Sequence, residues 1–240
     1  MDENRAAERP EEMHQHSGWL IPLAFLAVIA VLAALFLIYD LRPGMGPRNA
    51  GRTTDETPIV FSLRGLRLAV PANYLDSNEA RDGGERDALH LSALLPDFDG
   101  YSAQNARLFT GNAPDSPLVR ILFKSDELAL DARARMDRIY RPYLQEAGGK
   151  PADFGLTQYA FRPDSGYGRQ DLFAGTVDGQ IVLLLCERES ADLTSPTCFA
   201  ADRPVAPSVS VSYRFKRAYL GRWQEIATGA DALIERFRAP

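Results

Sequence analysis

The stretch QDLFAGTVDGQIVLLLCE, residues 170–187, decides the fold. Two runs typical of β-strands flank Val177, Asp178 and Gly179, and an Asp-Gly pair between such runs is a strong marker of a hairpin. The second run is apolar on both faces, so its strand should lie inside a sheet rather than at an edge. The sequence therefore predicts an antiparallel pair of strands near the centre of a sheet.

Other segments carry strand patterns on both sides of this pair. The first should form a hairpin or a bulged strand around Arg64 and Gly65. The last alternates strictly, with Val209 on one face and Ser210 and Ser212 on the other, which predicts that one face of this strand is exposed to water. The segments cover residues 59–71, 87–96, 117–124 and 208–216.

Two internal segments are expected to be helical. Residues 125–149 form the longer one, with Ser125 as the N-cap and Gly148 at the stop. Pro142 lies inside it and should kink or divide the helix, because proline removes one backbone hydrogen bond and crowds the preceding turn. A short helix capped at Ser102 is expected after the preceding turn.

The C-terminal residues follow the three-and-four spacing of an amphipathic helix, which would cover a sheet. Its apolar positions are Leu220, Trp223, Ala227, Ala230, Leu233, Ile234 and Phe237. Runs of strands broken by two or three helices, without regular alternation, predict an α+β fold. We expect a mainly antiparallel sheet covered by two or three helices, preceded by an N-terminal transmembrane helix.

The expected transmembrane helix is WLIPLAFLAVIAVLAALFLIY, residues 19–39, which contains no charged side chain. At about 1.5 Å per residue it is long enough to cross a hydrocarbon core of about 30 Å. Trp19 and Tyr39 bracket it as membrane-interface anchors. A buried core helix would show a polar stripe, and this segment has none. A cleaved signal peptide stays an alternative, although its apolar region would be shorter and would follow basic rather than acidic residues.

The segment divides the chain into four parts. An acidic, polar tail precedes it, and a stretch rich in arginine, proline and glycine follows it as a flexible linker. The predicted parts are a disordered cytoplasmic tail at 1–18, the transmembrane helix at 19–39, the linker at 40–58 and an extracytoplasmic α+β domain at 59–240.

The orientation depends on the two cysteines, Cys186 and Cys198. They flank a segment rich in turn-forming residues, so their side chains can meet in a disulfide, which requires an oxidising compartment. Two free buried thiols are the alternative. The arginines near the apolar segment slightly favour the opposite orientation. We give the disulfide more weight in deciding the orientation. The sequence therefore predicts a bacterial inner-membrane protein with a cytoplasmic N-terminus and a periplasmic C-terminal domain.

Charge excludes one class of partner. The net charge is −5, and the first eighteen residues contribute −3 of it, so the rest of the chain carries only −2. A charge this small gives no strong field for attracting nucleic acid, and we expect no nucleic-acid partner.

No motif for catalysis or cofactor binding is present. His90 is the single histidine after the apolar segment, and neither a phosphate-binding loop nor a nucleophile elbow occurs. We therefore expect no metal and no cofactor. Paired carboxylates that hydrolyse a glycan need not be near in sequence, so a carboxylate-dependent envelope hydrolase stays the alternative function.

One local concentration of basic residues follows the last strand: Arg214, Lys216, Arg217 and Arg222. Such a patch can bind phosphate, anionic lipid or an acidic partner, and the alternative is an ordinary solvated surface. An anchor, a linker and a compact domain without an active-site motif predict a non-enzymatic binding protein. Its expected partners are the lipid bilayer, through residues 19–39, and another envelope protein, which it serves as an accessory subunit or a toxin-immunity protein. A sensor is a weaker hypothesis.

Overall fold

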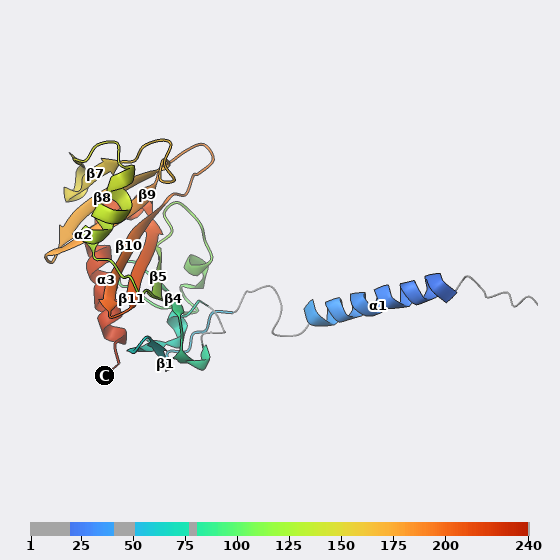
Figure 1. The fold of residues 1–240 in the computed structure, drawn as a ribbon. Helices are drawn as coiled ribbons and strands as arrows, with labels where there is room; N and C mark the ends of the chain where they lie inside the picture. The colour runs from blue at the N-terminus through green and yellow to red at the C-terminus, as the bar shows by residue number, and fades with distance from the viewer. Residues whose placement is uncertain (1–19, 41–50, 77–80, 240) are drawn as a thin grey trace, which may run out of the picture. The chain divides into compact units, whose positions relative to one another are not determined.

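The structure is a computed structural model that describes residues 20–40, 51–76 and 81–239 (Figure 1). The chain consists of two compact units, Met1–Asn49 and Ala50–Pro240. In the first unit, α1 (Leu20–Asp40) is a helix of 21 residues. Within the described ranges, no helix is long and apolar enough to cross a membrane. Trp19 lies outside the described residues, and the side chain of Tyr39 is not described.

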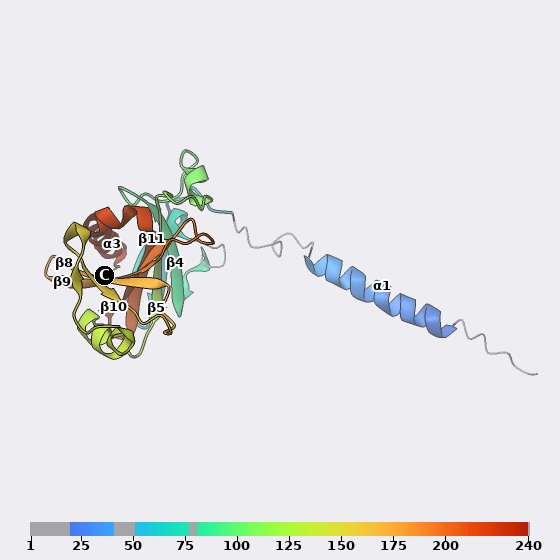
Figure 2. The same cartoon turned by 90° about the horizontal axis from the view of Figure 1, so that it is seen from above.

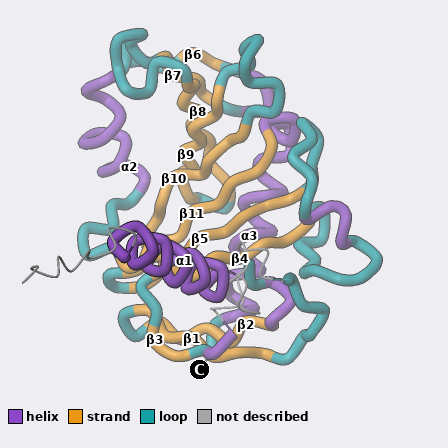
Figure 3. The backbone as a smooth tube through the Cα atoms, turned by 90° about the vertical axis from the view of Figure 1, so that its right-hand side faces the viewer, coloured by secondary structure: helices purple, strands orange, loops and turns teal. Residues whose placement is uncertain are grey.

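The second unit is built on an eight-stranded sheet in which every neighbouring pair is antiparallel. Figure 3 shows its strand order, β4-β5-β11-β10-β9-β8-β7-β6. This confirms the prediction of an α+β domain with a large antiparallel sheet. The strands are β4 (Ala88–Leu94), β5 (Leu118–Ser125), β6 (Lys150–Pro151), β7 (Thr157–Ala160), β8 (Gln170–Val177), β9 (Gln180–Glu187), β10 (Thr197–Ala206) and β11 (Val209–Lys216).

The central hairpin is the one that the sequence predicts. β8 and β9 close on the pair Val177 and Gln180. Asp178 and Gly179 both have positive φ, 50° and 76°, as the tight turns that match strand twist require. β9 lies between β8 and β10, so its predicted interior position is confirmed.

A smaller sheet has the order β2-β1-β3. Its strands are β1 (Pro58–Leu63), β2 (Leu66–Pro71) and β3 (Gly84–Glu85). β1 and β2 form the predicted hairpin around Arg64 and Gly65. The preceding residues contact the folded unit, because Arg52 forms an ion pair with Asp76 and the carbonyl of Thr57 accepts a hydrogen bond from the Ala72 amide. This last part of the predicted linker is therefore attached to the domain.

The two faces of the large sheet have different covers. We call the face that bears Leu91 and Val211 the inner face, and the face that bears Arg120 and Arg214 the outer face. The inner face packs against α3 (Trp223–Phe237), β1 and β2 in the main core. On the outer face, a second core covers β8 and β9 with residues around α2 (Ala132–Arg135). Figure 2 shows α3 and this yellow-green helical segment on opposite sides of the sheet.

The C-terminal helix is amphipathic, as predicted. A 3-10 helix, η7 (Arg217–Arg222), leads into α3. The buried residues of α3 are Trp223, Ile226, Ala227, Ala230, Leu233, Ile234 and Phe237.

The predicted helix at 125–149 is wrong in its start and in its length. Ser125 is the last residue of β5, because its amide donates to the carbonyl of Asp87 and it pairs with Val209. Asp131 is the cap instead, and its carboxylate accepts from the Ala134 amide at 2.8 Å. After α2 come the π-helical turn η4 (Met136–Tyr140) and the 3-10 turn η5 (Arg141–Tyr143), so the helical run ends at Pro142 and its neighbour.

The predicted helix capped at Ser102 also begins later. Ser102 and Asn105 exchange two hydrogen bonds, from each amide to the other's side chain, and this closes a turn before η3 (Ala106–Phe109). Two further short 3-10 helices are η1 (Ala72–Tyr74) and η6 (Asp153–Gly155).

The prediction that one face of the last strand is exposed to water is wrong for most of its length. Ser210 is 0% and Ser212 2% exposed. β11 lies between β5 and β10, where Ser210 is opposite Lys124 and Ser212 is opposite Leu122. Short hydroxyl side chains between longer neighbours are shielded from water, which strand alternation alone does not reveal.

Gly229 of α3 provides a test of the packing between this helix and the turn before η3. A Cβ atom at Gly229 would overlap the ring of Phe98, which is buried and has a φ of 57°. Alanine favours a helix interior over glycine by about 1 kcal/mol, but overpacking a core costs about 1 to 3 kcal/mol. We expect Gly229→Ala to lower the free energy of unfolding by about 1 kcal/mol or more in urea denaturation. The exposed Thr228→Ala is the control, and a stabilised Gly229→Ala would contradict this packing.

Candidate functional site

The disulfide predicted between Cys186 and Cys198 is present. The two residues lie opposite each other on β9 and β10, with Cα atoms 4.0 Å apart, and both are fully buried. Only three residue pairs join these two strands. The disulfide therefore holds the sheet together at a short ladder and closes the loop between the two strands.

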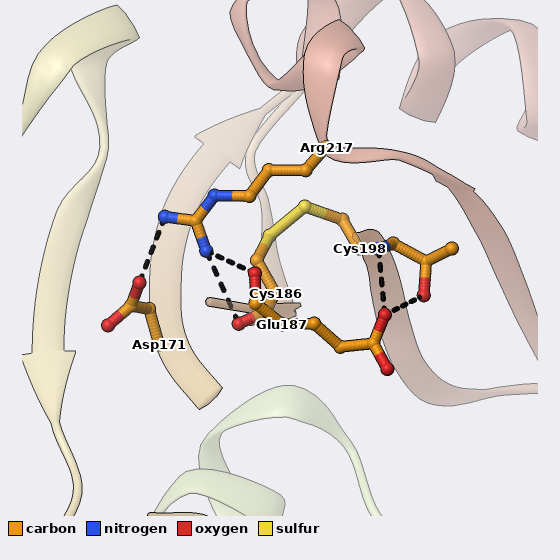
Figure 4. The surroundings of a disulfide bond; sticks show 6 residues. Asp171, Cys186, Glu187, Cys198 and Arg217 are labelled. Atoms are coloured by element: carbon orange, nitrogen blue, oxygen red, sulfur yellow. Dashed lines mark hydrogen bonds and ion pairs between the residues drawn. A yellow bond between two sulfur atoms is a disulfide. The ribbon is translucent and has the colours of Figure 1, made fainter. Parts of the chain in front are cut away.

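A buried carboxylate beside the disulfide fixes the same region (Figure 4). Asp171 on β8 is 5% exposed and accepts from Arg188 at 2.7 Å and from Arg217 at 2.9 Å. Arg217 also donates to the carbonyl oxygens of Cys186 and Glu187, at 3.4 and 2.7 Å. Burial raises the pKa of Asp171, but the hydrogen bonds and charges of the two arginines outweigh it, so the pKa lies below its ordinary value.

The structure does not bring the four predicted basic residues into one patch. Arg217 points toward Asp171 and forms an ion pair with it beside the disulfide. Arg222 forms an ion pair with Glu225 at the start of α3. Lys216 is buried and donates to Asn112 and Ser195. Arg214 alone is exposed on the outer face of the sheet.

A different basic residue joins Arg214. Arg120 on β5 lies directly opposite Arg214 on β11, and it is also exposed. The same row continues to Ser92 on β4 and to Phe199 on β10, where the guanidinium of Arg214 lies 5.5 Å from the ring centre. In the described part of the chain, neither arginine forms an ion pair with a carboxylate.

This arrangement lowers stability. Like charges directly opposite each other on adjacent strands cost about 0.2 to 1 kcal/mol. The same face carries the exposed His90 and the half-buried Leu122, which follow in the next row. We call the outer face at Arg120, Arg214, Phe199, Leu122 and His90 the basic face. It combines arginine with aromatic and apolar side chains, a composition typical of protein-binding surfaces.

Sequence reasoning missed Arg120 because its partner strand is distant in the chain. The alternation in residues 117–124 places Arg120 on the polar side of a strand, but nothing local predicts that β5 pairs with β11. Only the strand register makes Arg120 and Arg214 neighbours.

The acids that line the hollow between β9, β10, α2 and α3 are engaged by cations. Asp202 pairs with Lys124 and Arg135, and Asp231 pairs with Arg203. Among the residues that the structure describes, no group of three or more histidine, cysteine, aspartate or glutamate side chains could hold a metal ion.

No protein-family model matches the chain, and no curated protein matches it. Among solved structures, it is similar to an immunity protein of the Stenotrophomonas maltophilia type IV secretion system, with a TM-score of 0.57 and 18% identity over 81% of this chain and 98% of that one. It is less similar to the iron-regulated outer membrane lipoprotein FrpD of Neisseria meningitidis, with a TM-score of 0.45 and 10% identity over 79% of this chain and 100% of that one. The first likeness shows a shared fold.

Removal of the disulfide should destabilise the domain without abolishing its fold. A crosslink with a sequence separation of 12 stabilises by about 3 kcal/mol in the chain-entropy model. We expect the double variant Cys186→Ala, Cys198→Ala to lose about this much in equilibrium denaturation. Reductant should shift the unfolding midpoint of the unchanged protein toward that of the double variant and leave the variant's own midpoint in place. If reductant left the unfolding midpoint of the unchanged protein in place, the proposed contribution of the disulfide to stability would be refuted.

Asp171→Asn should destabilise the protein in a pH-dependent way. Removing one partner of a buried ion pair costs about 3 to 5 kcal/mol, and we expect the lower end because Arg188 is 42% exposed. The carboxylate's pKa is lowered in the folded state, so its contribution is complete above the unfolded value of about 4 and is lost as the pH falls through the folded value. Thermal unfolding should therefore separate the two proteins at pH 7 and bring them together toward pH 2. Asp164→Asn, at an exposed aspartate, is the matched control and should show no such separation.

Proposed function

We propose that this chain is a membrane-tethered protein of the bacterial envelope whose folded unit binds another envelope protein, as an immunity-type or accessory subunit. The observation that carries the proposal is the basic face. Among the described residues, Arg120 and Arg214 have no carboxylate partner, and they lie side by side on a part of the sheet that belongs to none of the three core clusters. A partner with acidic groups would relieve the repulsion between them and make use of both guanidinium groups.

The shared fold supports the immunity-type form of the proposal. One solved structure, which is matched over 98% of its own length, is an immunity protein of a type IV secretion system. At 18% identity this likeness concerns the backbone, so the identity of the partner has to come from the surface residues of this chain.

The disulfide and α1 support the proposed location. A buried disulfide forms and persists in oxidising compartments, which favours a periplasmic folded unit. In α1, Phe25 is 70% and Leu26 65% exposed, and a helix with apolar residues on its surface is stable in a non-aqueous environment. We therefore keep residues 19–39 as the proposed inner-membrane anchor, with the N-terminus in the cytoplasm.

The test uses the full chain in its own host. Spheroplasts that express it with a C-terminal tag are treated with a membrane-impermeant cross-linker, and the tagged protein is then purified in detergent. We expect one envelope protein to be recovered in near-stoichiometric amount, and the double variant Arg120→Glu, Arg214→Glu to reduce its recovery at least tenfold, because reversed charges at an interface cost several kcal/mol.

The matched control is Arg222→Glu, which changes an arginine of the predicted patch that lies away from the basic face. It should recover the partner as the unchanged protein does. The proposal would be refuted if the tagged chain were purified alone. It would also be refuted if the cross-linker reacted with the chain only after the spheroplasts had been lysed.

A further inference from the structure

A hollow of about 90 Å³ lies on the outer face where the basic face meets the end of β11. Its lining includes Asn112, Ser116, Arg120, Thr197, Arg214 and Lys216, and none of its lining residues is acidic. The volume gives room for a small charged group with a few water molecules, but not for a nucleotide-sized ligand.

Lys216 makes this hollow unusual. It and Asp171 are the two charged side chains that are buried among the described residues. Asp171 is compensated by two arginines, whereas the ammonium of Lys216 has only neutral acceptors: the Asn112 side chain at 2.7 Å and the hydroxyl and carbonyl oxygens of Ser195 at 2.7 and 3.2 Å. A buried charge without an opposite charge in contact is costly to the fold.

The electrostatics of the hollow favour an anion. Burial lowers the pKa of Lys216, and the positive charge of Arg120 lowers it further, while Glu187 opposes both effects. An anion placed between these cations would favour the charged form of Lys216 and reduce the repulsion between Arg120 and Arg214. Because the three ammonium hydrogens already face Asn112 and Ser195, Lys216 contributes charge, and the guanidinium groups contribute the hydrogen-bond donors.

A second, independent observation also points to a ligand. Ser116 lines the hollow and is 5% exposed, and its hydroxyl is buried without a hydrogen-bond partner in the structure. A buried hydroxyl without a partner costs about 1 to 3 kcal/mol. The hollow therefore contains an unsatisfied hydroxyl, a buried cation and two unpaired arginines in one place.

We propose that this hollow receives the carboxylate of an acidic side chain from the protein partner, held by Arg120 and Arg214 above the charge of Lys216. The inference rests on the proposed function and names the contact that the partner makes. A protein carboxylate fits better than a free phosphate, because Phe199 and Leu122 on the same face offer apolar and aromatic contacts to the residues around the acid.

The experiment measures binding of defined probes to the full chain in neutral-detergent micelles. Titration calorimetry compares a hexaglutamate peptide, a hexaglutamine peptide and inorganic phosphate. We expect the hexaglutamate peptide to bind, with phosphate at least tenfold weaker and the hexaglutamine peptide without measurable binding. Arg120→Gln, at an exposed position, and Lys216→Met, which removes the charge and keeps an unbranched side chain, should each weaken hexaglutamate binding about tenfold. Arg222→Gln is the matched control and should bind as the unchanged protein does.

Several outcomes would overturn the inference. Phosphate that binds as tightly as hexaglutamate would assign the hollow to a free or lipid phosphate, and equal binding to Arg120→Gln and the unchanged protein would place the contact elsewhere. If Arg120→Gln and Lys216→Met recover the cross-linked envelope protein undiminished, the inference fails while the proposed function stands. If the unchanged chain recovers no envelope protein, the proposed function fails and the inference fails with it.

Discussion

The register between β5 and β11 determines both the core and the surface of this domain. Six residue pairs join the two strands, from Val209 with Ser125 to Arg214 with Arg120. A shift of one strand by one residue would exchange the faces of that strand and move Val211 of β11, or Phe123 of β5, out of the core. Burying such side chains stabilises by about 1.5 to 3 kcal/mol each, whereas the repulsion between two opposed arginines costs about 0.2 to 1 kcal/mol. The core therefore imposes the register, and the arginine pair is its consequence on the other face.

The end of β11 separates two residues that are adjacent in the sequence. Lys216 is the last residue of the strand and lies on the outer side, at the hollow. Arg217 begins η7, turns toward Asp171 and binds the carbonyl groups beside the disulfide. One basic residue thus stabilises the short ladder between β9 and β10, and the other remains without a carboxylate. Adjacent basic residues in a sequence can therefore have different roles, one structural and one in the proposed binding site, where a strand ends and a helix begins.

The sequence predicts the elements whose signals are local. Asp178 and Gly179 identify the central hairpin because both residues tolerate positive φ, and α3 is recognisable because its buried positions repeat every three to four residues. The disulfide is predictable because its loop is short. The burial of Ser210 and the end of β5 at Ser125 are not predictable in this way, since both depend on strands that are distant in the chain. The candidate site depends on the same long-range pairing, so Arg214 and Lys216 could be named from the sequence and Arg120 could not.

The distribution of unpaired charge sets this hollow apart from the rest of the described structure. Arg52, Arg135 and Arg217 have largely buried side chains, and each forms an ion pair with an aspartate. Lys216 is more completely buried as a residue and has only neutral acceptors. Locally consistent sequences avoid such arrangements, and the places where a protein tolerates them are expected to be functional. Replacing a cation would remove the repulsion, so three cations and an unsatisfied hydroxyl around one small hollow are better explained by an anionic group that occupies it than by the needs of the fold.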